Sequence, residues 1–474
     1  MVRLDEGALE QKLDALERAR SWGPRVVSKL EALLRLEDDA LLFRVNALAF
    51  ASERGIEENE AVDLFLHATK LGLCIMEWQL ICPQCTDAVE TIHSLGAVGS
   101  TYHCNLCRKD LETSLDDLIQ VTFTVSPALR RLRFHDPDSL GIEDYCWGYH
   151  SSGSRGPDGR SWAESIRPFV AALGFVEPGQ VRRFELELRP GVIRGVDRFH
   201  RAEINIPVRS TPTGVPGPVR LRLEGGRFLP EALEIDSGPA VLEIENGMER
   251  RAAITTINIG PGRSPGPFVL PRFLTGKRLF VTQTFGDLFR SETVGRGGLA
   301  LKDLTFLFTD LKGSTALYDR IGDLKAFHLV DQHFDRLGQV IRRHHGAIVK
   351  TIGDAVMASF AGPQHAVACG VEMLRTIDDF NRERGSRDVI LKLGLHCGSS
   401  IAVTQNERLD YFGQTVNIAA RVQALAAGDE ICLTDQVMAA PGVRELLTGL
   451  DLTSGEAQLR GIERPLLVHR ARAR

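Results

Sequence analysis

The sequence predicts an α+β chain in which a helical segment, a cysteine-rich module and a β-rich region precede a C-terminal ferredoxin-like domain of β-α-β-β-α-β order. Three observations support this prediction. Apolar residues near the N-terminus recur three and four positions apart, as they do on one face of a helix. Short β-type runs separated by glycine and proline fill the middle of the chain. After residue 300, strand-like and helix-like patterns alternate.

Length and composition fit a protein of several globular domains. At 474 residues the chain is long for one core, and about two to four domains are expected. A charged share of 25% and a net charge of −5 argue against a broad nucleic-acid-binding surface or a membrane-surface protein. Charges follow Met1 where a secretory signal would have its apolar core, and no apolar run approaches the roughly 20 residues of a membrane helix. We therefore expect a cytoplasmic protein that has no membrane partner.

Residues 1–80 are expected to form a helical module. Leucine and valine recur at spacings near three and four, and the helical pattern extends to about Gln79. The plainest role for such a module is packing. The residues that carry the pattern are Leu13, Leu16, Val26, Leu30, Leu33, Leu34, Leu41, Val45 and Leu48.

Two CxxC pairs, Cys82 with Cys85 and Cys104 with Cys107, indicate a metal site in residues 81–110. Eighteen residues separate the pairs, which lies within the spacing of a four-thiolate zinc site. Such a closed site has no open position for water, so we expect a structural Zn²⁺ that folds a zinc ribbon. The alternative is four structural thiols that share this spacing by chance. Acidic residues predominate around the second pair, which argues against nucleic-acid binding.

Residues 115–295 are expected to form a β-rich regulatory domain. Five β-type runs stand between helix-breaking residues, which favours a sandwich or an open sheet. No catalytic pattern occurs in this region, so we interpret it as an input to the domain that follows. The five runs are Gln120–Val125, Arg183–Leu188, Glu203–Val208, Val219–Leu223 and Val241–Ile244.

The order of elements in residues 300–474 is that of a ferredoxin-like fold, an antiparallel sheet with helices on one side. One long helix is expected after the first strand, with Ser314 as its N-cap and apolar positions that include Leu324 and Phe327. Gly353–Asp354 is a two-residue turn of the kind that closes a hairpin. The predicted strands are Leu304–Phe308, Ala347–Ile352, Ala355–Phe360 and Val389–Leu395, and the second predicted helix is His365–Phe380.

Two aspartates stand where predicted strands end. Asp310 follows the first strand of the domain, and Asp354 follows the second. Carboxylates fixed at a sheet edge beside small residues suit Mg²⁺ with substrate phosphates. Further along the chain, Asn417 and Arg421 are four positions apart, which places an amide and a guanidinium on one helix face. Together these residues indicate a phosphoryl-transfer enzyme.

Three segments together resemble the catalytic domain of class III adenylate cyclases: Phe308-Thr-Asp-Leu-Lys-Gly-Ser-Thr, Lys350-Thr-Ile-Gly-Asp and Asp410-x6-Asn-x3-Arg. The resemblance covers about residues 300–474, and three motifs in the right order are far more specific than one. It implies conversion of ATP to 3′,5′-cyclic AMP and pyrophosphate with two Mg²⁺ or Mn²⁺ ions per active site. It also implies that Asp310, Asp354 and the carbonyl of Leu311 are ligands of these ions.

By the same resemblance, further residues contact the substrate. Gly313, Ser314 and Thr315 open a helix, so their backbone N–H groups can face the β- and γ-phosphates. Helix capping alone is the plainer explanation of this segment. Arg421 would stabilise charge on the α-phosphate, and Asn417 would orient the ribose.

Base recognition can be argued from hydrogen-bond polarity. Adenine presents an acceptor at N1 and a donor at N6, whereas guanine presents a donor at N1 and an acceptor at O6. Lys350 can donate to N1 and Asp410 can accept from N6, which matches adenine. Near the C-terminus, Arg460 stands where the family commonly has a triphosphate-binding lysine, and arginine keeps the charge with a different geometry.

The spacing of Lys350 and Asp354 favours a homodimer. Four positions on an extended strand span about 13 Å, so one nucleotide could not easily reach both residues of one chain. The resemblance implies sites that combine the metals of one protomer with the base-recognition residues of the other. Alternatives are a guanylate cyclase, a non-catalytic cyclase-like regulatory module, and a zinc-ribbon protein that binds a macromolecule. The complete residue set argues against the non-catalytic module.

Overall fold

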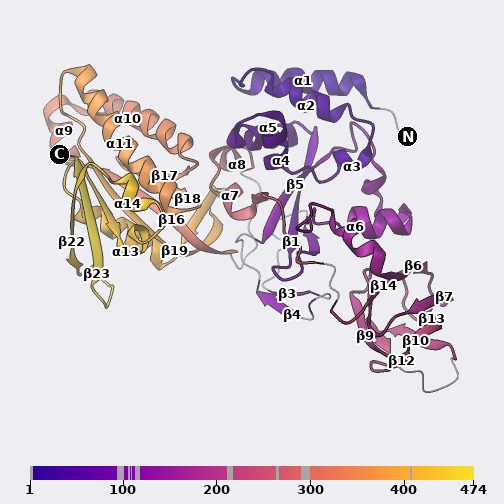
Figure 1. Cartoon of the computed structure of the whole chain (residues 1–474). Helices are drawn as coiled ribbons and strands as arrows, with labels where there is room; N and C mark the ends of the chain where they lie inside the picture. Colours follow the sequence, from indigo (N-terminus) through magenta and orange to yellow (C-terminus); the bar gives the residue numbers. More distant parts are fainter. Residues whose placement is uncertain are drawn as a thin grey trace.

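The computed structural model describes residues 4–92, 101–104, 107, 109–112, 118–210, 217–262, 266–289, 299–405 and 408–473. The chain has three parts: an N-terminal unit, a β-sandwich and a C-terminal domain (Figure 1). Within the described residues, we find no helix that is both long and apolar enough to cross a membrane.

Five helices pack against a four-stranded sheet in the N-terminal unit. Leu9, Leu16 and Leu30 are fully buried in a core that also holds Trp78 of the sheet. The helices are α1 (Glu6–Ala19), α2 (Val26–Leu34), α3 (Asp39–Leu42), α4 (Ala47–Arg54) and α5 (Glu58–Lys70). The sheet has the order β15-β5-β1-β2, with β1 (Cys74–Ile81), β2 (Ala88–Ile92), β5 (Ile119–Val125) and β15 (Leu274–Thr275). A separate two-stranded sheet contains β3 (Thr101–Cys104) and β4 (Lys109–Glu112).

The expectation of helix up to about Gln79 is wrong for its last residues. The segment Cys74–Ile81 is strand β1, because β5 and β2 pair with its two edges. Seven of its eight residues are buried, so it lacks the alternation that marks a half-buried strand. The expected boundary at residue 115 also falls inside this unit, since β5 pairs with β1 and β15.

The middle of the chain is a sandwich of two sheets with the orders β11-β10-β13-β7 and β12-β9-β8-β14-β6. Alternate residues such as Phe184, Leu186 and Leu188 of β7 are buried in the core between the sheets. Four of the five predicted runs are strands here, and the fifth is β5. The strands are β6 (Val170–Val176), β7 (Val181–Leu188), β8 (Gly191–Asp197), β9 (Ala202–Arg209), β10 (Val219–Glu224), β11 (Arg227–Leu229), β12 (Ile235–Asp236), β13 (Gly238–Asn246) and β14 (Ala252–Ile259), preceded by α6 (Trp162–Ile166).

The C-terminal domain follows the predicted β-α-β-β-α-β order. It begins with β16 (Leu299–Leu311), α9 (Ser314–Ile321), α10 (Asp323–Arg343), β17 (Ala347–Ile352), β18 (Ala355–Phe360), α11 (Pro363–Arg384) and β19 (Leu391–Gln405). The strand order is β17-β18-β16-β19, continued by β21-β23-β22, and β20 pairs with β19. The later elements are β20 (Arg408–Phe412), α12 (Gln414–Leu425), β21 (Glu430–Thr434), α13 (Asp435–Met438), α14 (Val443–Leu446), β22 (Leu450–Ala457) and β23 (Leu466–Ala473).

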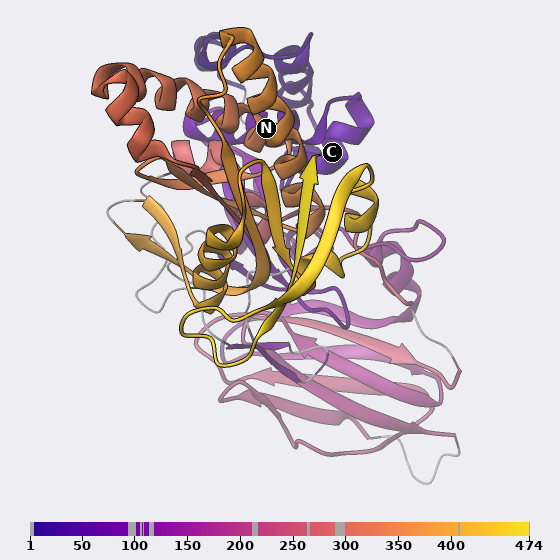
Figure 2. The same ribbon diagram turned by 90° about the vertical axis from the view of Figure 1, so that its left-hand side faces the viewer.

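Both faces of the C-terminal sheet are buried. Leu307 and Leu311 of β16 belong to one core with α10 and α11, whereas Phe306 and Phe308 belong to the core of the N-terminal unit. Two short helices, α7 (Gly276–Phe280) and α8 (Gln283–Leu288), contribute to that second core. They lie between the N-terminal helices and the C-terminal sheet (Figure 1). Figure 2 shows the same arrangement from the side of the C-terminal domain.

The predicted long helix after residue 314 consists of two helices. Gly322, at a φ of 81°, separates α9 from α10. The N-cap is Gly313 rather than Ser314, because Gly313 has the left-handed φ of 74° and Ser314 is already helical. Leu324 and Phe327 are 71% and 58% exposed, since they lie on the solvent side of α10 after the break.

Candidate active site

The two predicted metal carboxylates stand at neighbouring strand ends. Asp310 is the penultimate residue of β16, and Asp354 lies in the turn that joins β17 to β18. β16 pairs with β18, and Val356 N donates to Thr309 Oγ1 at 2.9 Å, so the turn lies beside the end of β16. Gly353, at a φ of 63°, allows the left-handed conformation that this tight turn needs.

The surroundings of these carboxylates fit a cation. Oδ2 of Asp354 is buried and has no hydrogen-bond partner among the described residues, which is costly for a carboxylate oxygen. Oδ2 of Asp310 lies 3.5 Å from Nζ of Lys392, which is opposite Asp310 in the register of β16 and β19. Carboxylate oxygens are the ligands that Mg²⁺ and Mn²⁺ prefer. Lys392 was not predicted from the sequence. A charged residue between two apolar residues, Leu391 and Leu393, which are both buried, is the pattern that could have indicated it.

Lys350 and Asp410 are in direct contact. Nζ of Lys350 donates to Oδ2 of Asp410 at 2.6 Å across 60 positions of sequence. The lysine side chain is 42% exposed and the aspartate side chain 12%, so the pair opens to solvent on the lysine side. Oδ1 of Asp410 accepts a hydrogen bond from the backbone N of Tyr411 at 2.8 Å. A ligand that replaces the bond between Lys350 and Asp410 would therefore meet one donor and one acceptor.

Asn417 and Arg421 lie one turn apart on α12, as predicted. Asn417 is exposed and Arg421 is half-buried. A Cβ atom at Gly461 would lie 3.4 Å from Nη1 of Arg421, so the guanidinium packs directly beside this glycine. Arg460 precedes Gly461 and is exposed. The structure therefore brings Arg421 to the segment that contains Arg460.

The segment Gly313, Ser314 and Thr315 opens α9 without a side-chain cap. It begins three residues after Asp310, so the positive end of the helix dipole lies close along the chain to that carboxylate. Three local groups thus emerge: the carboxylates, the Lys350–Asp410 pair, and the Arg421 region.

The four cysteines of the two CxxC pairs also lie together. Their Sγ atoms are all within 4.8 Å of one another, and all four thiols are free. The Sγ distances are 3.7 Å from Cys82 to Cys107 and 3.5 Å from Cys85 to Cys104. Hydrogen bonds with Cys104 and Cys85 lower the pKa of the Cys82 thiol. Hydrogen bonds within the cluster raise the pKa of Cys85 and Cys104, and burial raises that of Cys107, so one thiolate among the four is favoured. The cluster fits a metal ion with four sulfur ligands.

Comparison with known families identifies both halves of the chain. Residues 8–287, more than half of the chain, match a family of unknown function, DUF5939. The chain belongs to the DUF5939 family. Residues 300–461 of this DUF5939 protein match the adenylate and guanylate cyclase catalytic domain. The C-terminal domain is therefore a cyclase catalytic domain, and the resemblance drawn from the three motifs is confirmed.

Curated relatives of the DUF5939 protein match at modest identity. An adenylate cyclase of Anabaena cylindrica is 28% identical over 162 residues, which are 31% of this chain and 32% of the relative. Adenylate cyclase 1 of Rhizobium meliloti is 27% identical over 138 residues, which are 26% of this chain and 21% of the relative. An uncharacterized protein of Mycobacterium tuberculosis is 29% identical over 195 residues, which are 41% of this chain and 45% of the relative. The chain spans less than half the length of each of these relatives.

Two solved cyclase structures are similar to about a third of the DUF5939 protein. The adenylyl cyclase CyaB from P. aeruginosa has a TM-score of 0.32 and 20% identity, covering 36% of this chain and 93% of that chain. The guanylyl cyclase Cya2 has a TM-score of 0.34 and 21% identity, covering 37% of this chain and 94% of that chain.

Metal binding by the cysteine cluster can be measured directly. Elemental analysis of the purified chain is expected to find about one thiolate-bound metal ion per chain. Cys85→Ser should lose most of this metal and unfold at a lower temperature, because one of four ligands is missing. Cys397→Ser, a half-buried thiol outside the cluster, is the matched control and should keep the metal. Equal metal content in the two variants would contradict the assignment.

Proposed function

We propose that this DUF5939 protein is an adenylate cyclase that converts ATP to 3′,5′-cyclic AMP and pyrophosphate. The cyclase domain follows from the family match, and one observation supports the choice of ATP. That observation is the contact between Lys350 and Asp410 at 2.6 Å. The names of the relatives from Anabaena cylindrica and Rhizobium meliloti agree with this choice.

Adenine would bind at the base-recognition pair, which we define as Lys350 and Asp410. The lysine would donate to N1 and the carboxylate would accept from N6, so adenine would exchange one bond for two of matching polarity. Guanine would direct its N1 donor toward the ammonium and its O6 acceptor toward the carboxylate. Both protein groups would then lose their bonds, which costs more than a missing contact. The exposed lysine leaves the pair accessible to the base.

Asp310, Asp354 and the carbonyl of Leu311 would hold two Mg²⁺ or Mn²⁺ ions. The buried Oδ2 of Asp354, which has no hydrogen-bond partner among the described residues, supports this assignment. When bound, the ions supply charge neutralisation at the phosphates and promote loss of the proton from the ribose 3′-hydroxyl. Lys392, 3.5 Å from Asp310, would orient that carboxylate before a cation binds.

Arg421 would stabilise the negative charge that builds on the α-phosphate as the 3′-oxygen attacks. Asn417, one turn earlier on the same helix, would orient the ribose. Arg460 lies in the segment beside Arg421 and would contact the triphosphate end that leaves as pyrophosphate. The uncapped N–H groups at the start of α9, in Gly313–Thr315, would face the β- and γ-phosphates.

Two copies of the chain would complete the sites. Lys350 lies in β17 and contacts Asp410, whereas Asp354 lies in the turn beyond the end of that strand. The base and the metal-bound phosphates of one nucleotide would therefore contact different protomers. Because the chain carries both sets of residues, a homodimer with two equivalent sites is the simplest assembly.

The N-terminal 300 residues would have a regulatory role in this proposal. Four thiolates at close range suit Zn²⁺, which would hold the cysteine-rich module together without taking part in catalysis. Reduced thiols of this kind persist in the cytoplasm, where we place the protein.

Product formation tests the proposed activity. The full-length chain with ATP and Mn²⁺ is expected to form cyclic AMP, and Asp354→Asn should lower kcat by about a hundredfold or more because it removes a metal ligand's charge. Asp319→Asn, an exposed aspartate of α9, is the matched control and should keep activity. Chromatography of the nucleotides measures both. No product from ATP or GTP would refute the enzyme proposal, and product from GTP alone would make the protein a guanylate cyclase.

Base selection can be reversed at the base-recognition pair. Lys350→Glu combined with Asp410→Cys should lower the ratio of kcat/KM for ATP to that for GTP at least about tenfold, because the hydrogen-bond polarity changes. Lys325→Glu, at an exposed lysine of α10, controls for the change of charge. Unchanged selectivity in the double variant would remove the pair from base recognition.

Mixing two inactive variants tests the shared sites. Asp310→Ala and Arg421→Ala are each expected to be inactive alone. A mixture should regain up to about a quarter of wild-type activity, because half of the dimers are mixed and each mixed dimer has one intact site. Cyclic AMP formation is the measurement. A mixture as inactive as its components would argue against sites shared between protomers.

A further inference from the structure

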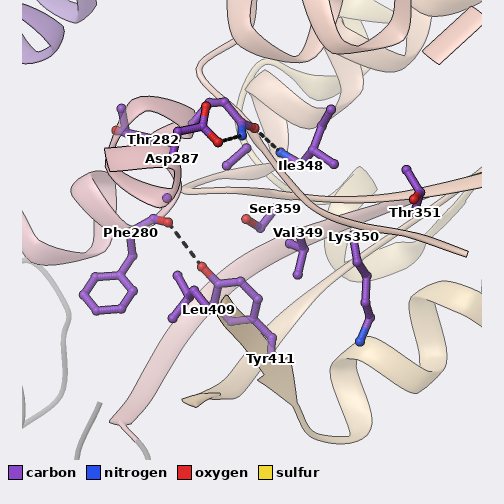
Figure 3. Close-up of a pocket in the computed structure, with 13 residues that line it drawn as sticks. Phe280, Thr282, Asp287, Ile348, Val349, Lys350, Thr351, Ser359, Leu409 and Tyr411 are labelled. Carbon is purple, nitrogen blue, oxygen red and sulfur yellow. Dashed lines mark hydrogen bonds between the residues drawn. The ribbon is translucent and has the colours of Figure 1, made fainter. Parts of the chain in front are cut away.

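The helices α7 and α8, at the end of the DUF5939 match, contact the edge of the cyclase sheet beside the base-recognition pair. Among the described strands, β17 forms one of the two edges of this sheet. Oε1 of Gln283 accepts a hydrogen bond from the backbone N of Ile348 in β17 at 2.7 Å. The hydroxyl of Tyr411 in β20 donates to the carbonyl of Phe280 at 3.4 Å, as Figure 3 shows. Two strands of the site are thus held by neighbouring helices of the N-terminal unit.

A β-bulge in β17 decides which face Lys350 occupies. Ile348 pairs with Ala358 and Lys350 pairs with Met357, so Val349 is an extra residue between the two pairs. In a regular strand, residues two positions apart share a face. Here Ile348 packs with the α10–α11 core and Val349 packs with the opposite core, on the side of Met357. Figure 3 shows Val349 and Lys350 directed to one side and Ile348 to the other.

Gln283 bonds the backbone at the start of this bulge. The N–H of Ile348 lies on an edge strand, where an unpaired donor would otherwise face water or another chain. The side-chain amide of Gln283 is itself fixed, because its Nε2 donates to Oδ1 of Asp287 one turn later on α8 at 3.0 Å. Gln283 therefore accepts the hydrogen bond that a neighbouring strand would otherwise accept. It does so at the bulge, where successive side chains of β17 cease to alternate between the two faces of the sheet.

Tyr411 forms the second link, next to Asp410. Its ring is buried and lies edge-on to Phe306, with centroids 5.3 Å apart. Its backbone N binds Oδ1 of Asp410, and its hydroxyl binds the carbonyl of Phe280. Burial raises the pKa of the Tyr411 hydroxyl, so the group stays a neutral donor. Tyr411 thereby links the backbone of α7 to the carboxylate of Asp410.

The helices α7 and α8 pack within the N-terminal unit and meet the cyclase sheet across a cavity. Phe280 and Phe285 pack on Trp78 of β1, with ring centroids 6.1 and 6.2 Å away. A cavity of about 250 Å³ lies between the helices and the strands β17 and β20, and Lys350 and Tyr411 are among the residues that line it (Figure 3). Close packing is therefore interrupted here, and the hydrogen bonds of Gln283 and Tyr411 bridge the two sides.

We propose that α7 and α8 position the base-recognition pair: Gln283 holds the bulge that turns Lys350 toward Asp410, and the Phe280 carbonyl holds Tyr411. The inference rests on the proposed adenylate cyclase function. Gln283 and Tyr411 are positioning residues, since they act through Lys350 and Asp410. Movement of the N-terminal unit changes nucleotide affinity and base selection more than the chemical step, because neither contact involves Asp310, Asp354 or Arg421.

The kinetic test uses the full-length chain and substitutions that preserve size. Gln283→Met removes the acceptor and should raise KM for ATP about tenfold, while Tyr411→Phe removes one weaker bond and should raise it about threefold. In both variants kcat should stay within about twofold, and preference for ATP over GTP should fall. Gln283→Glu combined with Asp287→Asn keeps an acceptor oxygen for Ile348 and a hydrogen bond between the two side chains, and should restore KM. Gln364→Met is the matched control, because that glutamine bonds the carbonyl of Pro441 at 2.8 Å instead.

A second measurement needs no activity. Hydrogen–deuterium exchange of a peptide spanning residues 347–352 should be faster in Gln283→Met than in the wild type, and unchanged in Gln364→Met. Unchanged exchange, or unchanged KM and base preference in both variants, would overturn the inference. Absence of product from the wild type would instead refute the proposed function. If Gln283→Met does not fold, the KM and selectivity of Tyr411→Phe decide, and wild-type values there would overturn the inference.

Discussion

Burial of both faces of the cyclase sheet determines where polar chemistry can be located. Leu307 packs with the helices on one side, and Phe306 and Phe308 pack with the N-terminal unit on the other. Each such side chain contributes about 1.5–3 kcal/mol when fully buried, and an unpaired charge among them would be costly. The carboxylates of the candidate metal site therefore lie where a strand ends or turns. Asp310 stands at a strand end and Asp354 in a turn, both of which satisfy this constraint.

The DUF5939 region covers one face of the cyclase sheet, because the two share a hydrophobic core. Trp78 of β1 packs with Phe280 and Phe285, and the same core includes Phe306 and Tyr411 of the cyclase sheet. β1 runs directly into Cys82, so one strand joins the cysteine cluster to the helices that contact the sheet. The sandwich is built around a separate core. The N-terminal unit is thus joined to the cyclase sheet through packed side chains as well as through the chain itself.

Prediction from the sequence succeeded where the signal was local. β17 and β18 have the predicted bounds, because a two-residue turn between two apolar runs defines a hairpin without distant partners. The strand nature of Cys74–Ile81 was missed, since a strand with two paired edges and two buried faces shows no alternation. The break at Gly322 was missed because a single glycine interrupts the apolar period too little to be distinguished from a continuous helix.

The chemical groups of the candidate site and their order along the chain could be taken from the sequence alone, because motifs and short-range periodicity are local properties. The side of the sheet to which Lys350 is directed, and its contact with Asp410, could be determined only from the tertiary structure. A bulge in β17, the register of β19 and β20, and a hydrogen bond from the backbone of Ile348 to Gln283 accompany that geometry. The pairing of Lys392 with Asp310 depends in the same way on register. Strand pairing joins residues far apart in the sequence, and local pattern carries no information about which distant backbone will complete it.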